Sequence, residues 1–261
     1  MSKPQYEVAD IIHLHGKAYE SLYQPAVQVS KVLRALSLCR TKALGGHVEV
    51  CKCCGTERVS YNSCRNRYCP KCQCTNREKW ILARESELLP VPYYHIVFTL
   101  PACFHELLPK YAKDVYNSLF EASWQTLKTF AADPKYLGAK AGMVAILHTW
   151  GQQLWLHPHL HCIVPGGGVT SSGKWKTSRC NGKYLFPKRA MSSVFRARFM
   201  ASLRKKITIP GSLAKQAFQK EWVVYAKRPF ASPMTVVEYL GRYTHKVAIS
   251  NHRLVDVNDT T

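Results

Sequence analysis

Hydrophobic positions follow a helical period in some stretches of the chain and a strand period in others, without a regular strand–helix repeat. Apolar residues three and four positions apart predict helices, and short runs rich in β-branched and aromatic residues predict strands. The expected helices cover 5–44, 75–89, 106–132, 191–206 and 233–245, and the expected strands 94–100, 143–149, 160–164, about 175, and 222–226. This irregular mixture predicts an α+β fold built on an antiparallel sheet.

Two prolines divide the pattern. Pro90 and Pro92 end the helix expected at 75–89 and precede the first strand, and proline disrupts regular helix. The N-terminal part combines helices with a cysteine-rich stretch at 47–76 that leaves little room for regular structure. We therefore expect a helical, zinc-binding and DNA-contacting domain at 1–90. A second domain at 91–261 should hold a central antiparallel sheet flanked by helices.

Composition and charge narrow the class of protein. With 46% hydrophobic and 20% charged residues, the chain is globular. Its 37 Lys and Arg outnumber 16 Asp and Glu, for a net charge of +21, which predicts a polyanionic partner such as nucleic acid. No apolar run approaches the roughly 18 residues of a membrane span, and the first residues lack a signal-peptide layout. We expect a cytoplasmic, nucleoid-associated protein with no membrane partner.

Most of the excess charge lies in one stretch. Positions 174–228 carry 15 basic residues and 1 acidic residue, with Trp175, Tyr184 and Phe186 among the cations. Aromatic and basic residues alternate in this way in grooves for single-stranded nucleic acid, although a solvated basic face without a partner is the alternative. The expected DNA-binding residues are Lys174, Lys176, Arg179, Lys183, Lys188, Arg189, Arg196, Arg198, Arg204, Lys205 and Lys206.

Eight of the 11 cysteines fall between Cys39 and Cys74. Clustered thiols in a chain without an export signal indicate a metal site rather than disulfides. Two C-x2-C pairs have the spacing of a four-thiolate zinc site, which is closed to substrate and therefore structural. The expected ligands are Cys51, Cys54, Cys69 and Cys72. Three other cysteines at 51–74 are surplus to these ligands, and ligand exchange with the second of them is an open alternative: Cys53, Cys64 and Cys74.

Three histidines alternate at His157, His159 and His161, and alternate residues of a strand share one face. Antiparallel pairing with the preceding apolar run would bring His148 to the same face. Imidazoles with open coordination positions suit a divalent cation that acts as a Lewis acid on phosphate, whereas satisfied core histidines are the alternative. We expect a catalytic metal site at His148, His159 and His161.

A nearby glycine pattern, from Gly168 to Lys174, fits G-x-x-x-x-G-K. Trp175 stands where a phosphate-binding loop needs Ser or Thr to hold Mg²⁺, and the segment leads into a turn rather than a helix. We therefore expect no nucleotide cofactor.

The last expected helix places Tyr239 and Tyr243 four residues apart, on one face. Two packed aromatic rings are the simplest interpretation of this pair alone. Beside an open metal site and a basic groove, the tyrosines become candidate nucleophiles, helped by Arg242 and His245. A phenol with a pKa near 10 needs such help, and a covalent phosphotyrosine would retain the bond energy for rejoining.

Four motifs together resemble the rolling-circle transposases of the insertion-sequence-91 group, within the HUH endonucleases. They are NSCRNRYCPKCQ, HIVFTLP, HPHLHCIVPGGG and YLGRYTHKVAISN. The resemblance implies an N-terminal zinc-binding domain followed by an HUH-type catalytic domain. It also implies Mg²⁺ or Mn²⁺ at His159 and His161, with His148 as the candidate third ligand, and Tyr239 and Tyr243 as the nucleophiles. The implied reaction nicks single-stranded or hairpin DNA at element ends, forms a 5′-phosphotyrosine link and transfers the strand.

Two departures from the family bear on this expectation. Tyr68 stands where the family usually has His, which leaves the four-cysteine assignment in place. The chain also ends 18 residues after Tyr243, whereas family members are usually longer, so we expect a C-terminally truncated member. The rival hypotheses are a catalytically silent zinc-dependent DNA-binding protein and a histidine-metal hydrolase that uses water.

Overall fold

The computed structural model describes residues 4–151, 153–178, 185–227, 230, 233–244 and 247–258. The chain divides into two compact units. The first comprises Met1–Ala83 together with Thr244–Thr261, and the second comprises Arg84–Tyr243. The sequence places a domain boundary after residue 90, close to the end of the first unit's N-terminal part, but gives no sign that the last residues return to this unit.

The first unit begins with two helices, α1 (Val8–Tyr23) and α2 (Val27–Ser37), where one helical stretch was expected. The break occurs at Gln24, whose φ of 43° is left-handed, followed directly by Pro25. At its start, α1 has a capping box in which the Asp10 carboxylate accepts the Glu7 backbone N–H at 2.7 Å. A short 3₁₀ helix, η1 (Lys42–Leu44), follows α2.

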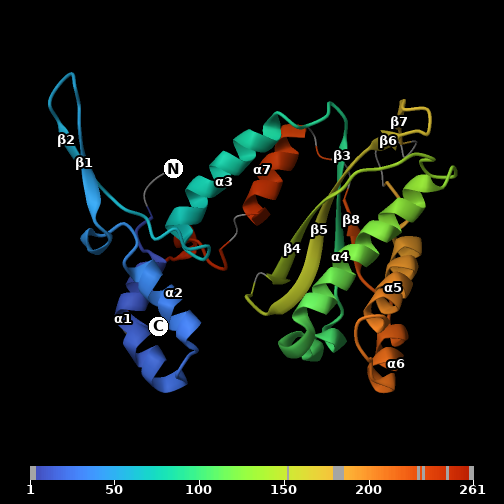
Figure 1. Cartoon of the computed structure of the whole chain (residues 1–261), viewed down its shortest axis with the longest axis horizontal. Coiled ribbons are helices and arrows are strands. Elements are labelled where there is room, and N and C mark those ends of the chain that lie inside the picture. Colours follow the sequence, from blue (N-terminus) through green and yellow to red (C-terminus); the bar gives the residue numbers. More distant parts are fainter. Residues whose placement is uncertain are drawn as a thin grey trace. The chain divides into compact units, whose positions relative to one another are not determined.

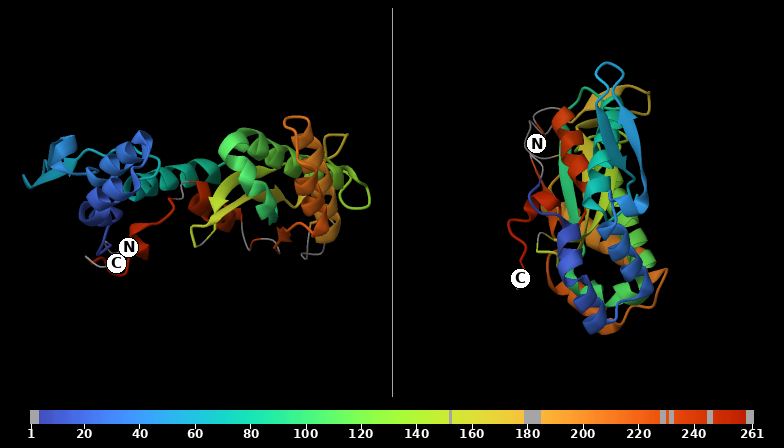
Figure 2. Two further views of the ribbon diagram at one scale, coloured as in Figure 1. Left: turned by 90° about the horizontal axis from the view of Figure 1, so that it is seen from below. Right: turned by 90° about the vertical axis from the view of Figure 1, so that its left-hand side faces the viewer.

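The cysteine-rich stretch contains more regular structure than expected. Strands β1 (Gly46–Val50) and β2 (Glu57–Tyr61) form an antiparallel hairpin, and α3 (Pro70–Glu85) starts before the expected position 75. Gly55, with a φ of 71°, supplies the left-handed residue of the turn, and proline at the first position suits a helix. The hairpin projects away from α1 and α2, as Figure 2 shows.

The chain after α7 (Pro233–Thr244) belongs to the first unit. There the 3₁₀ helix η3 (Asn251–Arg253) carries the buried Asn251. The Val8 backbone N–H donates to Asn251 Oδ1 at 3.1 Å, so a residue near the C-terminus satisfies an orphan donor at the start of α1. His15 Nε2 also contacts the Asn258 carbonyl at 3.2 Å.

A four-stranded sheet organises the second unit, and every pairing in it is antiparallel, which confirms the predicted fold class. Its strands are β3 (Tyr93–Thr99), β4 (Val144–Trp150), β5 (Leu156–Pro165) and β8 (Val224–Ala226), in the order β4-β5-β3-β8. A separate hairpin of β6 (Gly167–Val169) and β7 (Trp175–Thr177) follows β5. The segment 168–174 is therefore a hairpin, in agreement with the rejection of a phosphate-binding loop.

The helices α4 (Leu108–Ala132) and α5 (Lys188–Arg204) run beside the sheet (Figure 1) and provide most of the large core with it. Ile96 and Phe98 of β3 and Leu160 of β5 are fully buried in this core. Further helices of the second unit are η2 (Ala102–Leu107), α6 (Gly211–Gln219), which was not predicted, and α7 up to Tyr243. No helix in the described part of the chain combines the length and apolar character needed to cross a membrane.

Strand register separates two faces of this sheet. Side chains alternate along a strand, and paired residues point to the same face. Ile96, Phe98 and Leu160 point toward the helical core, so the residues between them point to the opposite face. The pairs Thr99↔His159 and His148↔His159 place histidines of β4 and β5 together there. We call this side, with His95, His148, His159 and His161, the histidine face.

Candidate active site

Three imidazoles converge on the histidine face. His148, His159 and His161 each offer a ring nitrogen, and these nitrogens lie within 4.8 Å of one another. Antiparallel pairing of β4 with β5 sets His148 directly opposite His159. His148 and His161 are buried, with exposed fractions of 2% and 7%. The structure thus brings together the three residues that the sequence analysis singled out.

The hydrogen bonds of His159 show which of its nitrogens faces this cluster. Its Nδ1 lies 2.5 Å from the His157 backbone carbonyl, which can only accept a hydrogen bond, so Nδ1 carries the proton. Nε2 is then the lone-pair nitrogen, and it lies 3.0 Å from Nε2 of His161. Neutral imidazoles with converging lone pairs suit a divalent transition metal. The three imidazoles therefore fit Mn²⁺, a transition metal, better than Mg²⁺, the other cation expected here, which prefers oxygen ligands.

His95, in the middle of β3, is a fourth histidine on this face and was not predicted. Its Nε2 lies 2.8 Å from His161 Nδ1, and the two rings stack at 5.1 Å with an interplanar angle of 7°. Burial, followed by the charges of Lys227 and His159, lowers the pKa of His95 to about 4, so the ring is neutral at pH 7. The signal available in the sequence is a single histidine among the aromatic and β-branched residues of the strand, at the start of the HIVFTLP motif.

Tyr239 of α7 belongs to the same cluster. Its hydroxyl lies 3.4 Å from His95 Nδ1, and its ring meets the His95 ring edge-on at 4.9 Å. The Tyr239 ring also contacts Phe230, at 5.2 Å between centroids. Tyr243 lies on the same helix, but its side chain and those of Arg242 and His245 fall outside the described residues. Of the two predicted nucleophiles, the structure brings Tyr239 to the histidines, and a role for Tyr243 stays a prediction.

The predicted DNA-binding residues are spread over several elements. Lys174 and Lys176 lie in the β6–β7 hairpin, while Arg179 and Lys183 fall outside the described residues. Lys188 lies over the ring of Tyr225 at 5.4 Å, and register places Tyr225 on the histidine face. The others belong to α5 or the turn after it: Arg189, Arg196, Arg198, Arg204, Lys205 and Lys206.

Two of these α5-region cations are occupied within the helical layer. Arg198 donates to Thr129 Oγ1 at 2.9 Å, and Lys206 pairs with Glu121 at 3.1 Å. Since α5 packs on the face of the sheet opposite the histidines, those predicted residues that the structure describes lie on more than one face of the sheet. Lys227, absent from the prediction, directly follows β8, donates its backbone N–H to the His95 carbonyl and has an exposed side chain. It brings positive charge to the histidines.

Four cysteines of the first unit also form a ligand cluster: Cys39, Cys64, Cys69 and Cys72. Cys72 Sγ lies 3.6 Å from Cys39 Sγ and 3.7 Å from Cys64 Sγ. Sulfur atoms at 2.3 Å from a tetrahedral zinc ion are about 3.8 Å apart, so this geometry fits Zn²⁺. The cluster is part of the unit's core, beside Leu36. Burial raises the pKa of Cys64 to about 11 and raises that of Cys69 further.

The cysteine cluster shares two of its four members with the predicted zinc ligand set. Cys69 and Cys72 are in the cluster, but Cys51 and Cys54 lie exposed at the end of the β1–β2 hairpin, where Cys54 Sγ contacts Thr56 Oγ1 at 3.1 Å. The hairpin carries them outward, and the turn after α2 supplies Cys39 instead. Cys64 is the open exchange ligand of the sequence prediction. Cys39 was not predicted as a ligand because it lies within the helix expected at 5–44. Cys53 and Cys74 are exposed.

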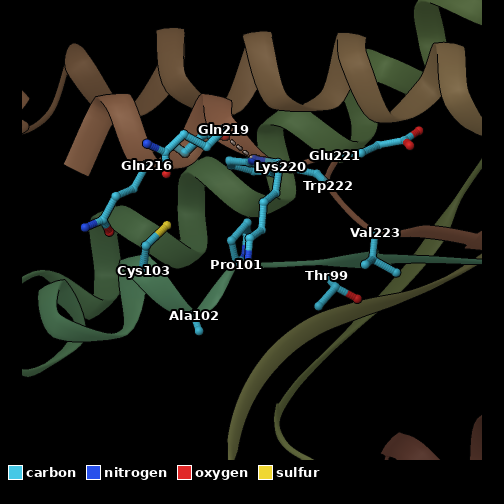
Figure 3. Close-up of a pocket in the computed structure, with 11 residues that line it drawn as sticks. Thr99, Pro101, Ala102, Cys103, Gln216, Gln219, Lys220, Glu221, Trp222 and Val223 are labelled. Carbon is cyan, nitrogen blue, oxygen red and sulfur yellow. Dashed lines mark hydrogen bonds between the residues drawn. The ribbon is translucent and has the colours of Figure 1, made fainter. Parts of the chain in front are cut away.

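A pocket with a volume of about 420 Å³ opens beside the end of β3 (Figure 3). Thr99, the partner of His159 in the sheet register, contributes to its wall. The labelled side chains include the amides of Gln216 and Gln219, and Lys220 extends toward Pro101. The pocket neighbours the imidazole cluster but shares no side chain with it. The rest of its lining is Ala102, Cys103, Ala217, Glu221, Trp222 and Val223.

Comparison with known sequences gives two family matches that cover different parts of the chain. Residues 11–100 match the family described as "Transposase zinc-binding domain", and residues 142–261 match the family described as "Putative transposase". The first match contains the cysteine cluster. The second contains the predicted metal ligands and both tyrosines.

Two relatives align over most of the chain. "Putative transposase y4qJ" of Sinorhizobium fredii is 45% identical over 278 residues, covering 99% of this chain and 69% of that protein. The "Transposase for insertion sequence element IS801" of Pseudomonas savastanoi pv. phaseolicola is 29% identical over 242 residues, covering 87% and 57%. The chain thus spans about two thirds of the first relative and somewhat less of the second.

Solved structures of the conjugative relaxase TrwC are also similar to part of the chain. A metal-bound complex with origin DNA has a TM-score of 0.33 and 15% identity, covering 42% of each chain. A complex with a 27-mer DNA has a TM-score of 0.34 and 16% identity, covering 46% of this chain and 48% of the relaxase.

Proposed function

Because the chain belongs to the insertion-sequence-91 type of rolling-circle transposases, we propose that its second unit nicks single-stranded DNA through Tyr239. The observation that carries this proposal is the junction of a tyrosine hydroxyl with an imidazole cluster: Tyr239 contacts His95, which contacts His161. A nucleophile and a set of metal-ligating nitrogens thereby share one face of a rigid sheet.

In the proposed step, the Tyr239 hydroxyl oxygen attacks a DNA phosphate. A bond forms between that oxygen and phosphorus, and the bond from phosphorus to the 3′-oxygen breaks. The phenolic proton is lost to solvent, and the departing 3′-oxygen takes up a proton and becomes a 3′-hydroxyl. The product is a 5′-phosphotyrosine link that conserves the phosphodiester energy for transfer to a second strand.

The three imidazoles would hold the catalytic cation through His148, His159 and His161. When bound, Mg²⁺ or Mn²⁺ supplies a Lewis acid that withdraws charge from the phosphate. Around it, Lys227 and Lys188 offer positive charge to the DNA backbone, and the Tyr225 ring offers an aromatic surface on which an unpaired base can stack. These residues would hold single-stranded or hairpin DNA from an element end across the histidine face.

The first unit belongs to a zinc-binding domain family, and we propose Cys39, Cys64, Cys69 and Cys72 as its four ligands. Four protein ligands leave no coordination position for a substrate, so the ion stabilises the fold and takes no part in cleavage. The basic residues around it, such as Arg65 and Arg67, would contact DNA outside the cleavage site.

The test of the nicking reaction is covalent capture of DNA. The full chain is incubated with a labelled pool of single-stranded DNA and Mn²⁺ or Mg²⁺, and adducts that survive denaturation are separated on a gel. We expect an adduct from the wild type that Tyr239→Phe abolishes. Tyr243→Phe and the double variant show whether the second tyrosine contributes.

The alternatives give different results in the same assay. An adduct that persists in the double variant would disprove tyrosine attack at these positions. Cleavage without any adduct would favour hydrolysis by water. DNA retention with neither cleavage nor adduct would instead favour a silent zinc-dependent DNA-binding protein.

A further inference from the structure

A continuous series of contacts connects the imidazole cluster with the proposed nucleophile. His161 Nδ1 lies 2.8 Å from His95 Nε2, and His95 Nδ1 lies 3.4 Å from the Tyr239 hydroxyl. His95 is 2% exposed, and it is the residue that stands between the other two. Each nitrogen of its ring therefore has a different partner, one belonging to a predicted metal ligand and one to the predicted nucleophile.

The proton of a neutral imidazole occupies one nitrogen at a time, so the two hydrogen bonds of His95 depend on each other. If His95 donates from Nε2 to His161, its Nδ1 must accept from Tyr239. If His95 accepts from His161 at Nε2, its Nδ1 must donate to the Tyr239 oxygen. The series of contacts thus has only two consistent directions.

Use of His161 as a metal ligand selects one of these directions. The nitrogen that faces His159 is Nε2, and it must carry a lone pair to bind a cation. The proton of a neutral His161 then lies on Nδ1, which donates to His95 Nε2. His95 consequently donates from Nδ1 to the Tyr239 oxygen, a hydrogen bond that favours the phenolate over the phenol.

We propose that His95 is a positioning residue that couples cation binding at His161 to the orientation and hydrogen bonding of the Tyr239 hydroxyl. This inference rests on the proposed function, and it assigns a role to a histidine that is not among the predicted site residues. The coupling sets the order of events. Once His161 binds the cation, the Tyr239 oxygen accepts a hydrogen bond from His95, so the hydroxyl is oriented for attack only after the cation has bound.

A purely structural role for His95 is the alternative, because its ring stacks on His161 and meets Tyr239 edge-on. The variants separate the two roles. His95→Phe keeps an aromatic ring and removes both hydrogen bonds. His95→Gln keeps a polar group near the position of Nε2, toward His161, and His95→Asn keeps one near the position of Nδ1, toward Tyr239.

Two readouts are measured on the full-length chain. Mn²⁺ affinity is obtained from the electron paramagnetic resonance signal of free Mn²⁺ in the absence of DNA. The rate of DNA adduct formation is measured at saturating Mn²⁺. Circular dichroism and the melting temperature verify that each variant folds.

We expect His95→Phe to weaken Mn²⁺ binding by about 10- to 100-fold, the usual effect of losing a partner that orients a ligand. Its adduct rate should fall at least about tenfold even at saturating Mn²⁺. His95→Gln should recover Mn²⁺ affinity without recovering the adduct rate. His95→Asn should show the opposite result: a higher adduct rate than His95→Phe, with Mn²⁺ binding as weak as in that variant.

A folded His95→Phe variant with wild-type Mn²⁺ affinity and wild-type adduct rate would overturn the inference. So would Gln and Asn variants that are both indistinguishable from the Phe variant, since that result assigns the effect to packing. If the wild type binds Mn²⁺ but forms no adduct, the proposed nicking function fails. The Mn²⁺ affinities of the Phe and Gln variants then still decide whether His95 orients His161.

Discussion

Each of the three imidazoles of the candidate metal site is held by a different neighbour. The His148 ring stacks on Trp150 at 5.9 Å with an interplanar angle of 3°. His159 donates to a backbone carbonyl, and His161 bonds to His95. Ring orientations are thereby set by groups that are not ligands, which reduces the reorganisation needed to bind a cation.

Two histidines of the H-P-H-L-H run, His157 and His159, are predicted to behave differently. His157 contacts His159 through its backbone carbonyl and ring to ring, at 5.1 Å between centroids, but its ring is not in the imidazole cluster. His157→Ala should therefore leave Mn²⁺ affinity within about threefold of the wild type. His159→Ala removes a ligand and should weaken binding by at least about tenfold, in the range known for damaged metal sites. Calorimetric titration with Mn²⁺ compares the two, and equal losses would contradict the assignment.

Zinc content distinguishes the cysteine cluster from the exposed cysteine pair. Cys39→Ser and Cys69→Ser each remove a buried member of the cluster and should abolish stoichiometric zinc in the purified protein. Cys51→Ser and Cys54→Ser change exposed thiols and serve as matched controls that should retain one zinc ion per chain. Metal analysis after gel filtration gives the result. Loss of zinc in the Cys51 or Cys54 variant would restore the ligand set predicted from the sequence.

At the scale of elements, strands β3 and β4 and the second half of β5 were predictable from sequence, because each is a largely apolar run close to a proline or glycine. The structure extends β5 back to Leu156, across Pro158. The antiparallel pairing of these strands was also expected, and it brings His148 opposite His159. Helix α6 escaped prediction because its nine residues carry a short apolar pattern after a glycine. The β1–β2 hairpin escaped because its strands expose valines that have no core to face.

Residue partners were harder to predict than elements. Cys39 joins Cys64 across 25 positions of sequence, and His95 meets His161 across 66 and Tyr239 across 144. Such contacts depend on how elements pack, and no local spacing records them. The C-x2-C spacing at Cys51 and Cys54 likewise does not record that the β1–β2 hairpin separates this pair from the cysteine cluster.

The β6–β7 hairpin is predicted to have a structural role. Gly168 of β6 lies against the Lys140 backbone, where Lys140 and Val169 exchange two hydrogen bonds of 2.9 Å, and an added Cβ would collide with the Lys140 carbonyl. Gly168→Ala should destabilise the second unit by about 1–3 kcal/mol through overpacking. Gly142→Ala is the control, because its Cβ would meet nothing within 4 Å. Thermal unfolding of the two variants compares them, and equal melting temperatures would refute the predicted clash.

At the scale of the whole molecule, the net charge of +21 predicts DNA binding that weakens steeply with salt. Log affinity for single strands falls by about 0.7 per neutralised phosphate for each unit of log salt concentration. Lys227→Gln removes a cation beside His95 and should reduce both the affinity and this slope, by about 0.7. Lys205→Gln, an exposed cation in the turn after α5, is the charge-matched control. Fluorescence anisotropy across a salt series measures the affinity and the salt slope of each variant. A larger effect from Lys205→Gln would indicate that DNA binds the helical layer instead of the histidine face.

The two compact units have separate cores, and only the core of the first contains the cysteine cluster. A structural zinc ion contributes its binding energy to folding, so a chelator should lower the unfolding transition of the first unit and leave that of the second near its original temperature.

Asn251→Ala should destabilise the same first unit by about 1–2 kcal/mol, because the Val8 N–H loses its acceptor. Asn258→Ala is its control, since His15 contacts the backbone of that residue. Differential scanning calorimetry resolves the transitions. A chelator that lowered both equally would show that the second unit depends on the first, and an Asn251 variant that lowered only the second transition would contradict the place of the C-terminal segment in the first unit.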